Sequence, residues 1–207
     1  MSVYALKPRF QALLRPLTTW LARAGVTANL VTIVAALGSI AAGAAVAWRA
    51  DVRAVFLIIP AWLLLRMALN AIDGMLAREF RQKSVLGGYL NEIGDVVSDA
   101  ALYAPFALVP PFGVLDIAMI IVLSIISEFA GVMGPLVGAS RRYDGPMGKS
   151  DRAVLFGALG LWVGVFGSLP AWLRWAMPVL AVLLVTTVIN RVRLGIGEAA
   201  PAGSPLR

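Results

Sequence analysis

Long apolar runs separated by short, turn-rich links make up most of this chain. A helix that crosses the hydrocarbon core of a bilayer needs about 20 mainly apolar residues. Segments of that kind lie at residues 26–48, 54–78, 84–109, 115–138, 152–169 and 172–191. Proline and glycine pairs mark several of the links, and no strand-like alternation is present. The pattern therefore predicts an all-α, polytopic membrane protein with six transmembrane helices.

A different pattern precedes the first span. Apolar side chains recur there at helical spacing, while basic and polar side chains fall on the opposite side: Phe10, Leu13, Leu14, Leu17 and Leu21 against Arg9, Gln11, Arg15 and Arg23. This pattern is typical of an amphipathic helix that lies in the membrane interface, and we expect one at about residues 3–23. The stretch lacks the apolar core of a cleaved signal peptide, so the first span is expected to stay attached.

Composition supports the membrane assignment and narrows the chemistry. The chain has 207 residues, of which 60% are hydrophobic and only 14% are charged. We expect a single membrane domain over residues 1–198 and a disordered tail at 199–207. The chain contains no cysteine and no histidine. Thiolate metal sites and Ser-His or Cys-His nucleophiles are thereby excluded, which leaves carboxylates, Lys or Tyr for proton transfer and oxygen ligands for a hard metal.

The net charge of +7 is better explained by membrane topology than by nucleic-acid binding. Most Lys and Arg residues fall in the N-terminal segment, in the links after the second and fourth spans, and after the sixth span. The opposite side holds Arg49, Arg53 and Arg174. Because basic residues concentrate in cytoplasmic links, both termini are expected in the cytoplasm.

Polar side chains interrupt the second and third spans at a fixed spacing. On each helix they share one face: Asn70, Asp73, Gly74 and Ala77 on the second, and Gly87, Asn91, Asp95 and Asp99 on the third. The short link between these helices makes them antiparallel neighbours, so the two polar stripes can meet. An ionisable side chain at a membrane helix centre costs at least about 2.5 to 3.5 kcal/mol. The stripes therefore predict a functional site.

The residue types in these stripes suit a phosphate-bearing substrate and a hard cation. Mg²⁺ and Mn²⁺ take carboxylate and amide oxygens and often share them with substrate phosphates, which makes Asp73 and Asp95 natural ligands. Arg78 would add positive charge to a pyrophosphate. Without histidine, Asp95 is the best base for an alcohol.

The spacing of these residues resembles that of a known family. The CDP-alcohol phosphotransferases share the pattern D-x2-D-G-x2-A-R-x8-G-x3-D-x3-D, and residues 70–95 keep every spacing of it. Six of its eight fixed residues match: Asp73, Gly74, Ala77, Arg78, Gly87 and Asp95. Asn70 and Asn91 replace the first and third Asp, as in a divergent bacterial subgroup. Two further segments also resemble the family. The first, with Thr27, Asn29 and Thr32, resembles the family's T-P-N-x-x-T. The second, Gly148-Lys149-Ser150 with Arg141-Arg142, resembles its later basic loop.

This resemblance implies an activity in phospholipid biosynthesis. An acceptor alcohol would attack the β-phosphorus of a CDP-alcohol, most simply CDP-diacylglycerol, and CMP would leave. In the family, carboxylates at the four Asp positions hold two metal ions. The implied metal ligands are Asn70, Asp73, Asn91 and Asp95, with Asp99 one turn beyond as a further donor, and Asp95 is the implied base. The implied substrate-binding residues are Asn29, Gly74, Ala77, Arg78, Gly87, Arg142 and Lys149.

The resemblance also implies a location and partners. The protein would sit in the bacterial inner membrane with its site at the cytoplasmic face, use Mg²⁺ or Mn²⁺, take a small polar alcohol as acceptor, bind no nucleic acid and form a homodimer as related enzymes often do. Each Asp-to-Asn replacement removes a negative charge, so weaker metal binding is expected.

Several alternatives stay open from the sequence. The chain could transfer a CDP-linked head group to diacylglycerol, bind lipid with weakened catalysis, or carry ions or protons past its buried carboxylates. In the simplest structural interpretation, Asp73 and Asp95 pair with Arg66 or Arg78 and only specify helix packing.

Overall fold

The computed structural model of this protein describes residues 6–199, and this part of the chain is helical without strands. Its α-helices are α1 (Leu6–Arg23), α2 (Ala28–Trp48), α3 (Ile58–Glu79), α4 (Val85–Tyr103), α5 (Val114–Val132), α6 (Lys149–Phe166) and α7 (Ala176–Ala199). Short 3-10 helices precede or follow some of them, at Arg53–Leu57 (η2), Ala104–Leu108 (η3), Gly134–Val137 (η4) and Ala171–Trp175 (η5). The all-α prediction is confirmed. Five of the six predicted apolar segments coincide with helical segments to within a few residues, and the last helix continues to Ala199, beyond the predicted end at residue 191.

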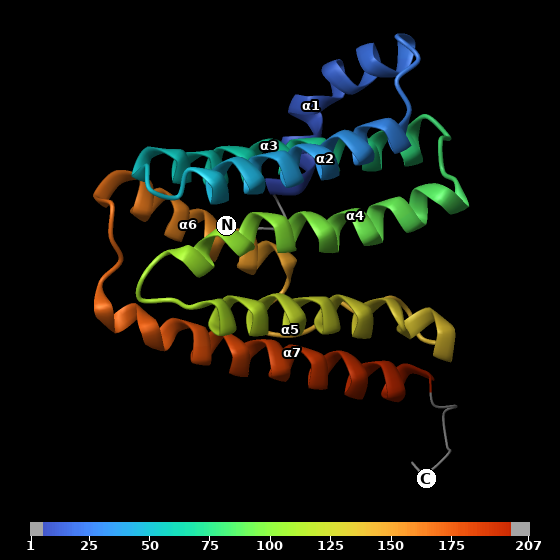
Figure 1. Ribbon diagram of the computed structural model, residues 1–207. Helices are drawn as coiled ribbons and strands as arrows, with labels where there is room; N and C mark the ends of the chain where they lie inside the picture. Colours follow the sequence, from blue (N-terminus) through green and yellow to red (C-terminus); the bar gives the residue numbers. More distant parts are fainter. Residues whose placement is uncertain (1–5, 200–207) are drawn as a thin grey trace.

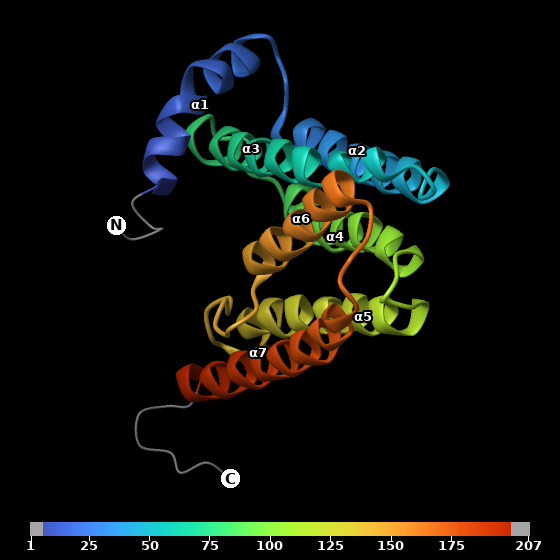
Figure 2. The same cartoon turned by 90° about the vertical axis from the view of Figure 1, so that its left-hand side faces the viewer.

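Helices α2 to α7 form a bundle in which successive helices run antiparallel (Figure 1). Helix α2 packs against α3 and α4, and α6 lies against α3. Helices α5 and α7 pack together as a second pair, which Figure 2 shows below the other four. The α1–α2 and α3–α4 links lie at the same end of the bundle (Figure 1).

Side-chain caps fix where the helices around these two links begin. Thr27 caps α2 by accepting a hydrogen bond from the backbone N–H of Leu30 at 3.2 Å, and Ser84 caps α4 by accepting one from Gly87 at 2.9 Å. Such caps satisfy backbone donors that a helix start leaves unpaired. Gln82 joins the two links, because its Oε1 accepts a hydrogen bond of 2.7 Å from the Ala28 N–H. The starts of α2 and α4 are thus held side by side.

The bundle has an aromatic centre and an apolar outer surface. The Tyr103 and Phe156 rings stack with centroids 3.8 Å apart, and Phe106 meets Phe156 edge-on. Large apolar side chains also face outward, as at Leu115 and Trp48, which are 85% and 86% exposed. An apolar exterior of this extent is expected where lipid, not water, is the surrounding solvent.

Four helical segments are long and apolar enough to cross a membrane: Ala28–Trp48, Arg53–Glu79, Val114–Val132 and Ala171–Ala199. Helices α4 and α6 are not among them. Helix α4 carries Glu92, Asp95 and Asp99, and α6 begins with several charged residues. Charged side chains, in the polar stripe of α4 and in the first turn of α6, therefore set these two helices apart.

Helix α1 coincides with the segment expected to be amphipathic. Leu14 and Leu21 pack toward α3, whereas Leu13 (75% exposed), Leu17 and Trp20 face outward. Its place in the membrane interface stays a prediction. The predicted start of this helix before Leu6 and the predicted tail beyond Ala199 lie outside the described residues.

The close packing of α2 on α4 gives a stability prediction. A Cβ placed on Gly43 of α2 would overlap the backbone of Ala101 on α4. Gly43→Ala should therefore lower stability by about 1 to 3 kcal/mol, the usual cost of overpacking. The midpoint of thermal unfolding in detergent measures this. Gly197→Ala is the matched control, since nothing lies within 4 Å of a Cβ there; equal midpoints for the two variants would contradict the packing described.

Candidate functional site

A cavity of about 340 Å³ opens between α2, α3 and α4, beside the two joined links. We call it the α2–α4 cavity. Most of the residues expected to bind substrate line it, together with one carboxylate and one amide of the polar stripes: Asn29, Gly74, Ala77, Arg78, Gly87, Asp73 and Asn91. Residues far apart in the sequence, in the Thr27–Thr32 segment and in the two stripes, are therefore brought together as predicted.

Small residues keep this cavity open. A Cβ on Gly87 would lie 2.7 Å from Oδ1 of Asn29, whose Nδ2 donates a hydrogen bond of 3.4 Å to Oγ of Ser84. A Cβ on Gly74 would lie 2.8 Å from Nη2 of Arg78. The Arg78 guanidinium can thus fold back across Gly74 only because that position has no side chain. The spacing of glycines in the motif serves close approach of polar groups.

Asp73 is the carboxylate at the inner wall of this cavity. It is 6% exposed, and its Oδ2 accepts a hydrogen bond of 2.9 Å from the Thr32 hydroxyl on α2. Within the described residues Asp73 forms no ion pair. A buried carboxylate with a single neutral side-chain partner favours a cation as a further ligand.

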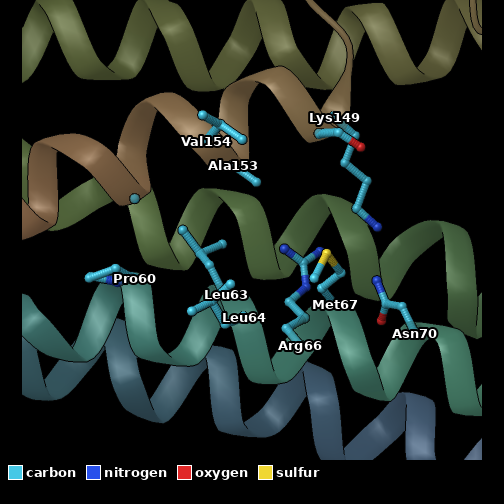
Figure 3. Close-up of a pocket in the computed structure, with 11 residues that line it drawn as sticks. Pro60, Leu63, Leu64, Arg66, Met67, Asn70, Lys149, Ala153 and Val154 are labelled. Atoms are coloured by element: carbon cyan, nitrogen blue, oxygen red, sulfur yellow. The ribbon is translucent and has the colours of Figure 1, made fainter. Parts of the chain in front are cut away.

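A second cavity, of about 480 Å³, lies between α3 and α6. We call it the α3–α6 cavity. Its walls are mostly apolar, with Leu63, Leu64 and Val154 among them, and its polar end holds Arg66, Asn70 and Lys149. Figure 3 shows Lys149 reaching from the start of α6 toward α3, where Arg66 and Asn70 project from below.

Asp95 meets the polar end of this second cavity. Its Oδ1 accepts hydrogen bonds from Nη2 of Arg66 at 3.0 Å and from Nδ2 of Asn70 at 3.4 Å. Its Oδ2 forms an ion pair with the Lys149 ammonium. Both carboxylate oxygens of Asp95 are therefore held by donors, and two of those donors are cations.

The ion pairs continue through the bundle as a ladder. Arg66 also pairs with Asp99 at 2.5 Å, and Asp99 pairs with Arg152 at 3.2 Å. Arg152 contacts Glu128 at 3.0 Å, and Glu128 lies 3.5 Å from Arg191. The ladder therefore links α3, α4, α5, α6 and α7, and its members are Arg66, Asp95, Asp99, Glu128, Lys149, Arg152 and Arg191. Buried pairs of this kind are stable only when both partners are present.

The structure changes the expected partners of several residues. Arg66 pairs with Asp95 and Asp99 and not with Asp73, because its guanidinium points to α4. Asp99 is buried between two arginines, deeper in the bundle than Asp95. Lys149, which the resemblance implied as a substrate-binding residue, forms an ion pair with Asp95. Glu92 pairs with Arg141, away from the stripe.

Arg142 is not brought to either cavity. It pairs with Asp144 and with Glu198 near the end of α7, so it ties the α5–α6 connection to that helix. Its proposed contact with substrate phosphate has no support in this arrangement. Asp151 caps α6 by accepting a hydrogen bond of 2.9 Å from the Gly148 N–H.

The groups around Asp73 suit a hard cation better than the groups around Asp95. No three His, Cys, Asp or Glu side chains gather as a metal site within residues 6–199. Among the described residues Asp73 has no ion-pair partner, and it shares its cavity with the Asn91 amide, a combination of oxygens that Mg²⁺ or Mn²⁺ accepts. Asp95, in contrast, is already neutralised by Arg66 and Lys149.

No protein-family model matches this sequence. The chain is 43% identical over 196 residues to the inner membrane protein YnbA of Escherichia coli (strain K12), and the match covers 93% of this chain and 96% of that protein.

Solved structures with the same fold include phosphatidylinositol phosphate synthase (PgsA1) of Mycobacterium tuberculosis. The structure with CDP-DAG bound has a TM-score of 0.74 and 21% identity, covering 93% of this chain and 97% of that one. The complex with manganese and citrate has a TM-score of 0.73 and 20% identity, covering 93% and 92%. PgsA1 is a CDP-alcohol phosphotransferase, so this chain has the fold of that family.

The ion-pair ladder predicts unequal effects of carboxylate removal. Asp99→Asn leaves Arg66 and Arg152 buried with one carboxylate fewer, and should lower the stability by about 3 to 5 kcal/mol. Glu79→Gln breaks the exposed pair with Arg15 at 2.9 Å and should leave the stability unchanged. Thermal unfolding in detergent compares the two variants. A loss for Glu79→Gln as large as that for Asp99→Asn would argue against a ladder that depends on burial.

Proposed function

We propose that this chain, which belongs to one family with the inner membrane protein YnbA and has the fold of the CDP-alcohol phosphotransferases, transfers a phosphatidyl group from CDP-diacylglycerol to a small polar alcohol and releases CMP. The observation that carries this proposal is the α2–α4 cavity, where Asn29, Arg78 and Gly87 meet beside Asp73. The fold shared with PgsA1, which was solved with CDP-DAG bound, supports this choice of donor.

The α2–α4 cavity would hold the nucleotide part of the donor. Its glycines admit a pyrophosphate close to the backbone, and the Arg78 guanidinium supplies positive charge at its edge. Asn29 offers an amide that can donate and accept hydrogen bonds at the mouth. The apolar walls of the neighbouring α3–α6 cavity run from its polar end to the outer surface, where Leu64, Met67 and Val154 are exposed.

In the proposed reaction the acceptor hydroxyl oxygen bonds to the β-phosphorus while the bond from that phosphorus to the CMP oxygen breaks. The hydroxyl proton passes to Asp95, which Arg66 and Lys149 hold in place as a carboxylate. A Mg²⁺ or Mn²⁺ ion held by Asp73 and the Asn91 amide, which line the same cavity, would supply charge neutralisation at the phosphates. Most of the rate would come from positioning and electrostatic stabilisation.

A lipid-binding relative with weakened catalysis is the second candidate, because Asn70 and Asn91 lower the negative charge of the site and Asp95 is ion-paired on both oxygens. Such a protein would bind CDP-diacylglycerol without releasing CMP, and restoring both asparagines to aspartate would raise the activity sharply. Transfer of a CDP-linked head group to diacylglycerol is the remaining alternative. Exchange of labelled CMP separates the two reactions, because the label enters the CDP-alcohol that the protein uses as donor.

We also propose that α4 and α6 cross the bilayer, which gives six spans with both termini and the site at the cytoplasmic face. The ladder that buries the charges of α4 and α6 among their neighbours supports this arrangement. We retain a homodimer as the proposed assembly.

Removal of the proposed base gives the central prediction. Purified protein is incubated with CDP-diacylglycerol, Mn²⁺ and pooled small alcohols, and CMP release and the mass of the lipid product are measured. Asp95→Asn should lower the rate by about 10² to 10⁴-fold, since it removes general-base catalysis. Asp51→Asn, at an exposed carboxylate in the α2–α3 link, is the control and should keep the full rate. Undiminished CMP release by Asp95→Asn would refute the assignment.

The topology can be tested with single cysteines, because the chain has none of its own. In intact bacterial cells a membrane-impermeant maleimide should label Asp51→Cys, in the α2–α3 link, and should label Lys83→Cys, in the α3–α4 link, only after the cells are lysed. The opposite pattern would invert the proposed orientation, and labelling of both in intact cells would contradict a span at α3.

A further inference from the structure

The two carboxylates of the polar stripes differ in their direct partners. Asp73 has a threonine hydroxyl as its side-chain partner and no ion pair within the described residues. Asp95 has Arg66 and Asn70 on one oxygen and Lys149 on the other. A divalent cation that approached Asp95 would meet two positive charges at contact distance, which repel it.

Arg66 cannot move aside to admit an ion. Its side chain is 4% exposed, its Nη1 is held by Asp99 at 2.5 Å, and its Nη2 donates both to Oδ1 and to the backbone carbonyl of Asp95 at 3.0 Å. A guanidinium fixed by several hydrogen bonds in a low-dielectric interior is a permanent part of the site. Lys149, with 31% of its side chain exposed, is the more mobile of the two cations.

The net charge of the whole ladder also disfavours a metal ion at Asp95. Its ion pairs connect the cations Arg66, Lys149, Arg152 and Arg191 with the carboxylates Asp95, Asp99 and Glu128. Four positive groups meet three negative ones, so the ladder carries a surplus of one positive charge without any metal. A surplus of this sign favours an anionic group and disfavours a further cation.

We propose that this chain binds a single divalent cation, at Asp73, and that Arg66 and Lys149 supply the fixed positive charge at Asp95 in place of a second ion. Asn70 fits this arrangement, because its amide nitrogen donates to Asp95, which a carboxylate at that position would not do. Asp73 and the Asn91 amide face the α2–α4 cavity, so the single ion would lie on that side, while the ammonium of Lys149 lies on the side of the α3–α6 cavity. The assignment of this site as catalytic rests on the proposed function, whereas the predicted number of bound ions does not.

The number of ions is measured with the metal alone. Full-length protein in detergent is titrated with Mn²⁺, and free Mn²⁺ is followed by electron paramagnetic resonance. We expect one Mn²⁺ per chain. Asp73→Asn should weaken its binding by more than the roughly 10 to 100-fold that loss of an outer-shell partner costs. The double variant Asn70→Asp/Lys149→Met, which adds a carboxylate and removes the mobile cation beside Asp95, should bind two.

Arg174→Met is the matched control. Arg174 lies in the α6–α7 link over the Trp175 ring and lines neither cavity, so this variant should still bind one ion. Thermal unfolding of each variant verifies that it is folded before ions are counted.

Two ions or none in the wild-type protein would overturn the proposal, as would unchanged Mn²⁺ affinity in Asp73→Asn or a single ion in the folded double variant. The outcome is separable from that of the transfer assay. One bound Mn²⁺ without any CMP release would remove the proposed activity and leave the single-ion site in place.

Discussion

The Arg66 guanidinium, buried between two carboxylates of the neighbouring helix, is the interaction on which the rest of the site depends. It joins α3 to α4 through Asp95 and Asp99, and so fixes how the two polar stripes face each other. In a medium with little water, an unpaired charge of this kind is costly, so the pairs specify one rotation of each helix. Helix packing and the arrangement of reactive groups are therefore set by the same contacts.

This constraint divides the site into two parts with different electrostatics. On one side Asp73 faces a cavity framed by small residues and by the capped starts of α2 and α4. On the other side Asp95 is surrounded by positive groups at the end of an apolar cavity. A substrate with a charged phosphate part and a lipid part suits this division, since each part of such a molecule prefers a different environment.

The sequence predicted the helices, and which residues share one face of a helix, because both depend on local spacing. Apolar runs locate the helices, and residues four apart, such as Asn91 and Asp95, must share a face. It did not predict the partners of Arg66 or the position of Arg142. Those depend on how far each helix is rotated about its axis and on the path of the α5–α6 connection, which no spacing encodes. Arg152 and Arg191 looked like ordinary basic residues of cytoplasmic links, yet both are buried in ion pairs.

The order of the ladder along the chain has a consequence for biogenesis. Arg66 emerges from the ribosome before Asp95 and Asp99, so these groups can pair as soon as the hairpin of α3 and α4 is complete. Glu128 on α5 must wait, because its partners are Arg152 on α6 and Arg191 on α7. The nascent protein therefore passes through a stage in which α5 carries an uncompensated carboxylate. Release of this helix from the insertion machinery into lipid is expected to be delayed until the last two helices have been synthesised.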